Sequence, residues 1–425
     1  MNYYEALEFI HSRMKFGSRP GMERITALCN ELGNPQDKLK FVHVAGTNGK
    51  GSTCNMIAKI LEAAGYKTGL FTSPYIVDFR ERMQINSQMI PKEELAQLVS
   101  EIKPVVEKLS AQGIEPTEFE IITAVSFEYF LNNGCDIVVL EVGLGGLLDS
   151  TNIIKKSEVS VICSISLDHT DILGNTLLKI AEQKCGIFKE GGRVVGYPQP
   201  DFAVERYIKE QAAKMNCSYM HADLSKIRLV REELDGSTLI YAGCTFKIPL
   251  TGKHQIYNFS TAISAINTLK QNGWEISMQN VIDGLAALKM PARTEIVCEK
   301  PLTIIDGGHN PEGVDALCLT LKTHCKDKKI IAVFGMMKDK DYSYCIEHLA
   351  PLCSRIYTTT PSNPRALPAK ELAKAVKPYC GRVKPVDDFG KAFEKAKKKA
   401  GEEDMVLVCG SLYLASDIKN LQKQS

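Results

Sequence analysis

The chain has 425 residues, of which 44% are hydrophobic and 24% charged, and its formal net charge is +2. This length predicts two or three domains, each large enough for a core of its own. The balanced charge argues against a nucleic-acid-binding or membrane-surface protein, and no stretch approaches the roughly 18 apolar residues that a membrane-spanning helix needs.

Short β-branched runs alternate with helical patterns over the first half of the chain. This alternation predicts βαβ units, and therefore a mostly parallel sheet with helices on both faces. The expected strands are residues 41–44, 68–72, 136–142, 159–165 and 193–196, and the expected helices include 52–64 and 119–131.

The pattern changes after Asn216 and changes back near residue 290. Short runs joined by Asp235-Gly236 and Ala242-Gly243 predict antiparallel hairpins, which form a small accessory sheet. We place a domain boundary between residues 292 and 293, which gives domains 1–292 and 293–425. The accessory runs are 227–232, 238–241 and 244–249, a helix is expected over 255–272, and the later strands are 302–305, 330–334, 354–358 and 405–409.

A glycine-rich segment joins the first expected strand to the helix after it. Glycines let backbone N–H groups face a polyphosphate, and the start of the helix adds a positive field. Lys50 is placed to reach the β- and γ-phosphates and Ser52 to offer its hydroxyl to Mg²⁺, but Gly51 separates them, unlike in the usual motif. A strand–helix turn without a ligand is the alternative. The coincidence of strand, loop, lysine, hydroxyl and helix favours ATP binding by Gly46-Thr47-Asn48-Gly49-Lys50-Gly51-Ser52.

Two polar residues follow expected strands at the edge where ligands of an α/β sheet bind. Glu141 ends one strand, and His169 follows another between two aspartates. Together they fit a Mg²⁺ site, although imidazole is an unusual ligand for this ion. A helix-capping or ion-paired glutamate and an ordinary loop histidine are the alternatives. Lys184 lies in a helical pattern, where a surface lysine is equally compatible with the composition.

These motifs resemble, in order, those of the folylpolyglutamate synthase and dihydrofolate synthase family, which is related to the Mur ligases. The resemblance covers almost the whole chain. It implies a P-loop domain with a mostly parallel sheet and an accessory sheet, followed by a smaller Rossmann-like glutamate-ligase domain. The matching segments are 46–52, 72–74, 140–146, 168–170, 252–255 with Asn258, 306–311, 338–342 and 364–366.

The resemblance also implies roles for particular residues. Lys50, Lys184 and His309 are implied as catalytic, with Lys184 carbamylated so that it binds a second Mg²⁺. The implied nucleotide-binding residues are Thr47, Asn48, Gly49, Lys50, Gly51, Ser52, Asn258, Arg293 and Asp306. The implied metal ligands are Ser52, Ser73, Glu141, His169 and Lys184, and the implied substrate contacts are Thr117, Phe119, Glu120, Leu148, Asp149, Ser150, Ser411 and the segment 16–24.

The implied reaction joins L-glutamate to a folate or to dihydropteroate. The acceptor carboxylate attacks the γ-phosphorus of ATP, and the glutamate amine then attacks the acyl phosphate. Tyr75 stands where the family has histidine and Leu147 where it has arginine, which leaves the acceptor preference open. For Thr117 and Glu120, a helix start in which these two residues form the cap explains the match to the family's acceptor contacts equally well. A Mur-type ligase for another carboxylate and a nucleotide-dependent binding module are the alternative functions.

The cysteines and the first residues indicate the compartment. Fourteen cysteines are scattered without a Cys-x-x-Cys pair, which predicts reduced thiols rather than disulfides or a zinc site. The first residues lack the basic start and apolar stretch of a signal peptide. We therefore expect a cytoplasmic monomer whose partners are small-molecule substrates, not nucleic acid or membrane.

Overall fold

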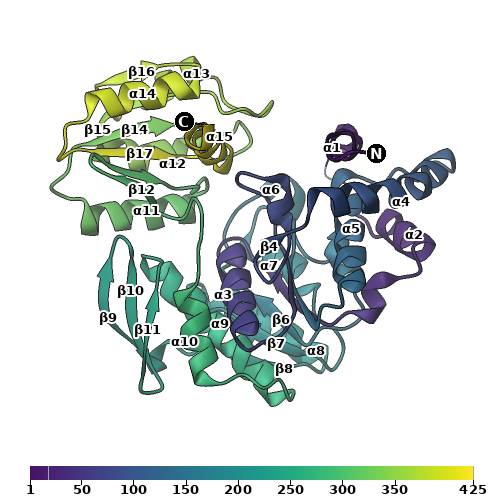
Figure 1. The fold of residues 1–425 in the computed structure, drawn as a ribbon. Coiled ribbons are helices and arrows are strands. Elements are labelled where there is room, and N and C mark those ends of the chain that lie inside the picture. Colours follow the sequence, from purple (N-terminus) through teal and green to yellow (C-terminus); the bar gives the residue numbers. More distant parts are fainter. Residues whose placement is uncertain (18, 425) are drawn as a thin grey trace. The chain divides into compact units, whose positions relative to one another are not determined.

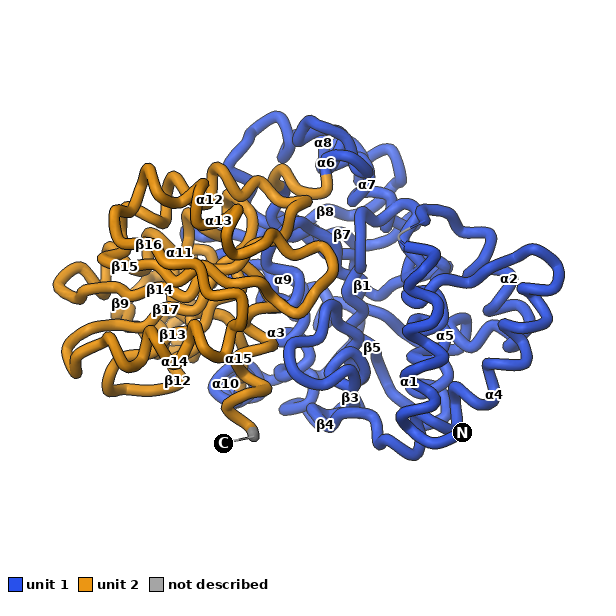
Figure 2. The backbone as a smooth tube through the Cα atoms, turned by 90° about the horizontal axis from the view of Figure 1, so that it is seen from above, with its two compact units in different colours: residues 1–165, 170–225, 257–287 blue, residues 166–169, 226–256, 288–425 orange. Residues whose placement is uncertain are grey.

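A computed structural model describes residues 1–17 and 19–424. The chain folds into two compact units, shown in different colours in Figure 2. Unit 1 comprises residues 1–165, 170–225 and 257–287, and unit 2 comprises residues 166–169, 226–256 and 288–425. Unit 2 thus includes the accessory hairpins, which precede residue 292. The expected domain boundary at 292/293 stays a prediction. The predicted acceptor-side segment 16–24 contains Ser18, which lies outside the described residues.

Unit 1 is built on an eight-stranded sheet with the order β4-β3-β2-β5-β1-β6-β7-β8. In this order, each pair of neighbouring strands from β2 through β5, β1, β6 and β7 to β8 is parallel. Strands β3 and β4 add an antiparallel edge. Every residue of β1 and β5 is buried, which explains why these strands are mostly apolar. The strands are β1 (Phe41–Ala45), β2 (Thr68–Phe71), β3 (Met83–Ile85), β4 (Gln88–Met89), β5 (Ile137–Glu141), β6 (Val159–Ile162), β7 (Arg193–Gly196) and β8 (Ser218–His221).

Strand β8 corrects the sequence analysis, which placed a change of architecture after Asn216. The parallel sheet continues through residues 218–221, which pair with β7. This strand lies at the sheet edge and none of its residues is fully buried, so it has no apolar run that the sequence pattern could reveal.

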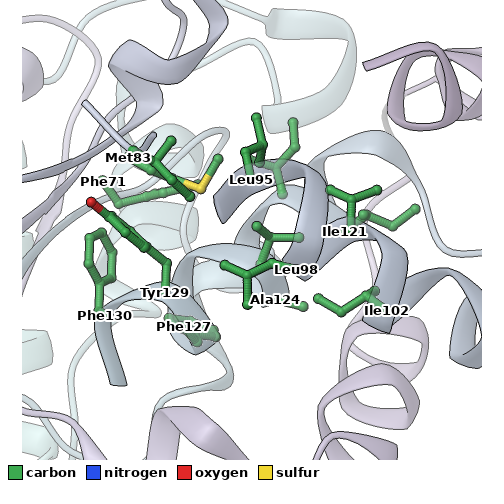
Figure 3. Packing of buried hydrophobic residues seen from close by; sticks show 14 of the residues in the cluster. Phe71, Met83, Leu95, Leu98, Ile102, Ile121, Ala124, Phe127, Tyr129 and Phe130 are labelled. Carbon is green, nitrogen blue, oxygen red and sulfur yellow. The ribbon is translucent and has the colours of Figure 1, made fainter. Parts of the chain in front are cut away.

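Helices cover the sheet of unit 1, and four of them build a large apolar core with β2, β3 and β5. Figure 3 shows part of it, with Leu95, Leu98 and Ile102 from α4 against Ala124 and Phe127 from α5. The helices are α1 (Tyr3–Ser12), α2 (Glu23–Glu31), α3 (Lys50–Ala63), α4 (Lys92–Ala111), α5 (Glu118–Asn132), α6 (Thr170–Leu173), α7 (Leu177–Cys185), α8 (Phe202–Lys214) and α10 (Met278–Ala286), and α9 (Lys253–Gln271) runs from unit 2 into unit 1.

Unit 2 contains two sheets, both visible in Figure 1. The predicted accessory sheet is confirmed as the antiparallel strands β9 (Ile227–Glu233), β10 (Gly236–Tyr241) and β11 (Cys244–Ile248). The second sheet has the order β12-β13-β17-β14-β15-β16 and is parallel except for β12. Its strands are β12 (Glu295–Glu299), β13 (Leu302–Ile305), β14 (Ile330–Phe334), β15 (Cys353–Thr358), β16 (Val383–Pro385) and β17 (Met405–Cys409).

Five helices accompany this second sheet, and its core is formed by apolar residues of its strands and helices. The predicted α/β class with two mostly parallel sheets and one small antiparallel sheet is therefore confirmed. Across the described residues, no helix is both long and apolar enough to span a bilayer. The helices are α11 (Pro311–His324), α12 (Tyr342–Leu349), α13 (Ala369–Val376), α14 (Phe389–Lys399) and α15 (Leu412–Gln424).

Candidate active site

The turn between β1 and α3 depends on glycine at two positions. Gly46 and Gly49 have φ angles of 156° and 81°, which side chains rarely adopt. A Cβ on Gly46 would lie 2.6 Å from Cβ of Cys163, and one on Gly49 would lie 2.3 Å from Oδ1 of Asn258. The turn is therefore fixed between the end of β6 and the helix α9, with the start of α3 directly behind it.

Lys50 and Ser52 lie in the first turn of α3. The Nζ of Lys50 donates hydrogen bonds to the carbonyl oxygens of Gly46 and Thr47, each at 3.1 Å, so its ammonium lies across the glycine turn. Ser52 is buried. Gly51 lies beside the carboxylate of Glu141, because a Cβ there would lie at contact distance, 3.7 Å, from Oε2 of Glu141.

Glu141 ends β5, which lies beside β1 in the sheet. Its side chain is only 4% exposed, and its Oε2 accepts the backbone N–H of Ser73 at 3.2 Å. A buried carboxylate beside the glycine turn suits Mg²⁺, which is typically bound through one or two carboxylates together with phosphate oxygens and water. Within the described part of the chain, no group of three or more His, Cys, Asp and Glu side chains could hold a metal ion. The residues present thus fit a phosphate-assisted Mg²⁺ site better than an all-protein one.

Lys184 is buried in α7, and it is therefore not the surface lysine that the sequence left open. Its Nζ donates to the carbonyl oxygen of Gly46 at 2.7 Å, the same oxygen that Lys50 contacts. The turn after β5 packs tightly on α7, because a Cβ on Gly146 would lie 3.0 Å from Cα of Lys184. Two ammonium groups therefore converge on one backbone oxygen beside the glycine turn.

His169 belongs to unit 2 by its packing, and its φ angle is 49°. Lys340 Nζ lies 3.3 Å from its Nε2 and 2.7 Å from Oδ1 of Asp168, whose other oxygen accepts from Asn310 at 3.2 Å. Burial alone would raise the pKa of Asp168, but the charges of Lys340 and His169 hold that pKa well below its usual value. The shared metal site of His169 and Glu141 stays a prediction.

Asp306 organises the segment that carries Arg293. It accepts the N–H of Thr294 at 2.9 Å and that of Gly308 at 2.7 Å. Ala292 and Thr294 have φ angles of 56° and 48°, so Arg293 lies between two residues in left-handed conformations. Such backbone strain is found where a neighbouring side chain must be held in place. Asp306 therefore supports Arg293 through the backbone.

His309 follows the same segment and is a neutral imidazole at pH 7. Burial, reinforced by the charge of Lys340, lowers its pKa to about 4. Its Nδ1 lies 2.9 Å from the carbonyl oxygen of Gly307, which a protonated Nδ1 satisfies. Ser411 is also buried in unit 2, and its Oγ accepts the N–H of Tyr413 at the start of α15. The resemblance implied His309 as a catalytic residue and Ser411 as a substrate contact, and both roles stay predictions.

The predicted acceptor residues of α5 have clear structural partners. Thr117 and Glu120 form the capping box of α5, and Glu120 also pairs with Arg24 at 3.0 Å. The ring of Phe119 lies against the turn after β5, where a Cβ on Gly143 would be 2.5 Å from Cζ of Phe119. The alternative explanation of Thr117 and Glu120 as a helix start is thus confirmed, while their contact with substrate stays a prediction.

The second acceptor group lies in the turn before the 3₁₀ helix η4 (Ser150–Ile153). Asp149 caps this helix and accepts from Thr151 Oγ1 at 2.6 Å and from the N–H of Leu144 at 2.8 Å. Ser150 is buried, whereas Leu148 is 43% exposed and free to meet a ligand.

The sequence analysis missed a buried histidine that supports this turn. His43, in the centre of β1, is fully buried, and its Nε2 lies 2.9 Å from Oγ1 of Thr151, which in turn donates to Asp149. Burial, with a smaller effect of Lys189, lowers the pKa of His43 to about 3. The only sequence signal was one polar residue inside an apolar strand, and it did not reveal the partner more than a hundred residues away.

Comparison with known proteins identifies the class that this fold and this site define. The chain matches the Mur ligase middle domain over residues 44–266 and the Mur ligase glutamate ligase domain over residues 292–412. It therefore belongs to the Mur ligases.

Within that class the chain belongs to the dihydrofolate synthase and folylpolyglutamate synthase family. It is 39% identical to a dihydrofolate synthase/folylpolyglutamate synthase of Bacillus subtilis, with 99% of both chains covered. It is 37% identical to the folylpolyglutamate synthase of Lacticaseibacillus casei, over 99% of this chain and 98% of that one. A folylpolyglutamate synthase of Mycobacterium tuberculosis, solved with ADP and AMPPCP, superposes with a TM-score of 0.89 at 29% identity, covering 99% of both chains.

Proposed function

We propose that this chain is a ligase that joins L-glutamate to a folate-type acceptor at the expense of ATP, through an acyl phosphate. The observation that carries the proposal is the convergence of Lys50, Lys184 and the buried carboxylate of Glu141 at one glycine turn, in a member of this family. Two cations and a metal-binding anion at one turn suit a phosphoryl group that is transferred from ATP to the acceptor. A related E. coli structure holds ADP and DHPP, which supports both substrate classes.

The residues act by positioning and by charge neutralisation, as phosphoryl transfer requires. The amides of residues 46–52 hold the ATP phosphates, and Lys50 exchanges its carbonyl contacts for phosphate oxygens. The acceptor carboxylate attacks the γ-phosphorus and ADP leaves. The amine of glutamate then attacks the acyl carbon, loses a proton and releases phosphate. His309, neutral at pH 7, offers the incoming glutamate a ring nitrogen rather than a positive charge.

We propose two Mg²⁺ sites. Ser52, Ser73 and Glu141, with His169, would hold the first ion, and a carbamate on Lys184 would supply anionic oxygens for the second, which an ammonium cannot do. When bound, Mg²⁺ offsets negative charge on the transferred phosphoryl group. Asn258, which contacts Gly49, and Arg293 with its support Asp306 complete the proposed nucleotide site.

The acceptor is dihydropteroate, a tetrahydrofolate that already carries glutamate, or both. The proposed acceptor contacts lie on α5 and on the turn before η4. Leu147 is 43% exposed beside that turn, where it offers an apolar surface instead of the bidentate anion contact of an arginine. The proposed contacts are Thr117, Phe119, Glu120, Leu148, Asp149 and Ser150.

ATP turnover by the purified chain tests this proposal. ADP formation is measured with dihydropteroate or tetrahydrofolate, each with and without L-glutamate, and the product is weighed by mass spectrometry. We expect sustained turnover only when both substrates are present, and a product that has gained one glutamate. ADP formation indifferent to both substrates would identify a nucleotide-dependent binding module, and turnover only with a nucleotide-linked peptide would identify another Mur-type ligase.

We further propose that the protein is a cytoplasmic monomer. All fourteen cysteines are free thiols in the structure, which suits a reducing compartment. Light scattering of the purified protein at catalytic concentrations tests the monomer, and a stable dimer would contradict it.

A further inference from the structure

The C-terminal end of α7 is hydrogen-bonded to the turn that follows β5. A helix leaves its last carbonyl groups without partners inside the helix. Here the carbonyl oxygen of Gln183 accepts the N–H of Leu147 at 2.7 Å, and that of Gly186 accepts a hydrogen bond from Nδ2 of Asn152 at 3.0 Å. Nδ2 of Asn152 also donates to the carbonyl oxygen of Leu147 at 3.0 Å. One side-chain amide therefore joins the turn to the end of the helix.

Lys189 fixes the orientation of this amide. Its Nζ donates to Oδ1 of Asn152 at 2.8 Å and to the main-chain oxygen of Asn152 at 3.2 Å. An ammonium group can only donate hydrogen bonds, so Oδ1 must face Lys189 and the NH₂ group must face the two carbonyl oxygens. Without the lysine, a half-turn of the amide would bring Oδ1 against a carbonyl oxygen, where two acceptors repel one another.

Lys189 is a costly residue at this position. Burial lowers its pKa to about 8, and among the described residues it forms no ion pair with a carboxylate. Burying a charge without an opposite charge costs free energy. Both of its hydrogen-bond acceptors belong to Asn152, so the role that its contacts support is to orient that amide.

Lys184 lies in the last turn of α7, where the helix and the turn after β5 touch. A Cβ on Gly146 would lie 3.0 Å from Cα of Lys184, and a Cβ on Gly186 would lie 2.5 Å from Cα of Leu147. At the far end of its side chain, Nζ of Lys184 donates to the carbonyl oxygen of Gly46 at 2.7 Å. A shift of the helix end would therefore move this ammonium group away from the glycine turn.

We propose that Asn152 and Lys189 are positioning residues that hold the end of α7 against the turn after β5, and so keep Nζ of Lys184 at the glycine turn. This inference rests on the proposed function, which gives Lys184 its role. Within the described part of the chain, neither residue forms a hydrogen bond with the glycine turn itself. Their effect on turnover should therefore pass through Lys184 and disappear when Lys184 is absent.

Asn152→Ala tests the proposal in two backgrounds. A displacement of about 1 Å can cost about 100-fold in rate, so we expect kcat of the otherwise unchanged protein to fall about 10- to 100-fold. In the Lys184→Ala protein the same substitution should lower kcat less than about 2-fold, because the effects of residues that act through one another do not add. Lys189→Met, which keeps the bulk of the side chain but removes the donor, should show the same pattern.

A second measurement needs no turnover. Mass spectrometry follows how fast an amine reagent modifies Nζ of Lys184 in buffer free of bicarbonate. This lysine is 3% exposed, so it should react slowly in the unchanged protein. In Asn152→Ala it should react at least about 5-fold faster, because local opening of the helix end exposes it.

The matched control is Asn280→Ala, which removes an amide that binds the last carbonyl oxygen of another helix, that of Ala63 in α3. It should change neither kcat nor the labelling of Lys184. The proposal is overturned if Asn152→Ala lowers kcat by the same factor with and without Lys184, or if it leaves kcat or the labelling rate unchanged. If the unchanged protein ligates glutamate to no folate acceptor, the proposed function itself has failed, and the labelling comparison still tests the contact.

Discussion

Lys50 and Lys184 contact the same backbone oxygen, that of Gly46, at 3.1 and 2.7 Å. Like charges so close together repel one another, and burial strengthens that repulsion. An anion between them relieves it, whether it is a phosphate oxygen or a carbamate formed on Lys184. This pair is the residue-scale reason to assign phosphoryl chemistry to the turn.

Lys184→Ala tests the buried lysine. We expect kcat to fall about 100-fold or more, the typical loss when one preorganised charge contact of a transition state is removed. Nuclear magnetic resonance with carbon-13 bicarbonate should show a carbamate signal in the unchanged protein and none in the variant. Lys179→Ala, at an exposed position of the same helix, is the control. Unchanged multiple-turnover ligation by Lys184→Ala would refute the role of this residue.

Glu141→Gln tests the proposed role of this carboxylate as a metal ligand. The amide keeps the shape of the side chain but loses the charge that a cation needs, so the Mg²⁺ concentration for half-maximal turnover should rise about 10- to 100-fold. The control is Asp136→Asn, which makes the same change just before the start of β5. In the described structure the carboxylate of Asp136 accepts a hydrogen bond from the backbone N–H of Lys67. Equal Mg²⁺ dependence of the two variants would remove Glu141 from the metal site.

His43 predicts how stability depends on pH. Its pKa is about 3 in the folded protein against an ordinary 6.5, because burial disfavours the charged form. Above pH 6.5 the ring is neutral in both states and contributes nothing. As pH falls below 6.5 only the unfolded chain binds the proton, so the free energy of unfolding drops by about 1.4 kcal/mol per pH unit, or about 2 kcal/mol by pH 5.

The thermal midpoint of His43→Gln should therefore fall less steeply between pH 6.5 and pH 5 than that of the unchanged protein. The matched control is His221→Gln, which alters an exposed histidine. Scanning calorimetry at several pH values measures both. A variant whose midpoint tracks the unchanged protein at every pH would show that His43 is not buried in its neutral form.

At the scale of elements, the glycine turn depends on two properties of Gly49: a left-handed backbone and a close neighbouring side chain. Gly49 and Gly65 lie at the two ends of α3 with φ angles of 81° and 89°, but only Gly49 has a neighbour within reach of an added Cβ. A non-glycine residue in this conformation costs roughly 1 to 2 kcal/mol. The two positions therefore separate strain from crowding.

Gly65→Ala should lower stability by about that amount and leave KM for ATP unchanged. Gly49→Ala should carry the same penalty and also displace Asn258, so KM for ATP should rise by an order of magnitude or more. Thermal unfolding and initial rates distinguish the two effects. Equal KM values for the two variants would show that the contact with Asn258 does not shape the nucleotide site.

The sequence pattern predicted those strands and helices whose burial requires a run of apolar residues. The fully buried strands β1 and β5 were predicted from their mostly apolar residues, and the glycine turn and Glu141 at their ends were proposed as ligand-binding from sheet geometry. The exposed edge strands β8, β12 and β16 have no such run and escaped prediction. Pairings between distant residues, such as Lys184 with Gly46 or His43 with Thr151, depend on tertiary packing that no local pattern encodes.

At the scale of the whole molecule, each compact unit supplies a different part of the proposed chemistry. Unit 1 carries the glycine turn, Glu141, Lys184 and the proposed acceptor residues, whereas unit 2 carries His309 and the strained segment around Arg293. We propose that residues of the first set bind ATP and the acceptor, and that residues of the second set bind the incoming glutamate. In this mechanism ATP activates the acceptor carboxylate before glutamate attacks.

Transfer of labelled oxygen tests that claim most directly. The acceptor is prepared with oxygen-18 in its reacting carboxylate, turned over with ATP and L-glutamate, and the released phosphate is examined by mass spectrometry. The account predicts that each phosphate carries one labelled oxygen, because the carboxylate oxygen that attacks the γ-phosphorus leaves with it. Phosphate without label, released at the rate of ligation, would contradict it.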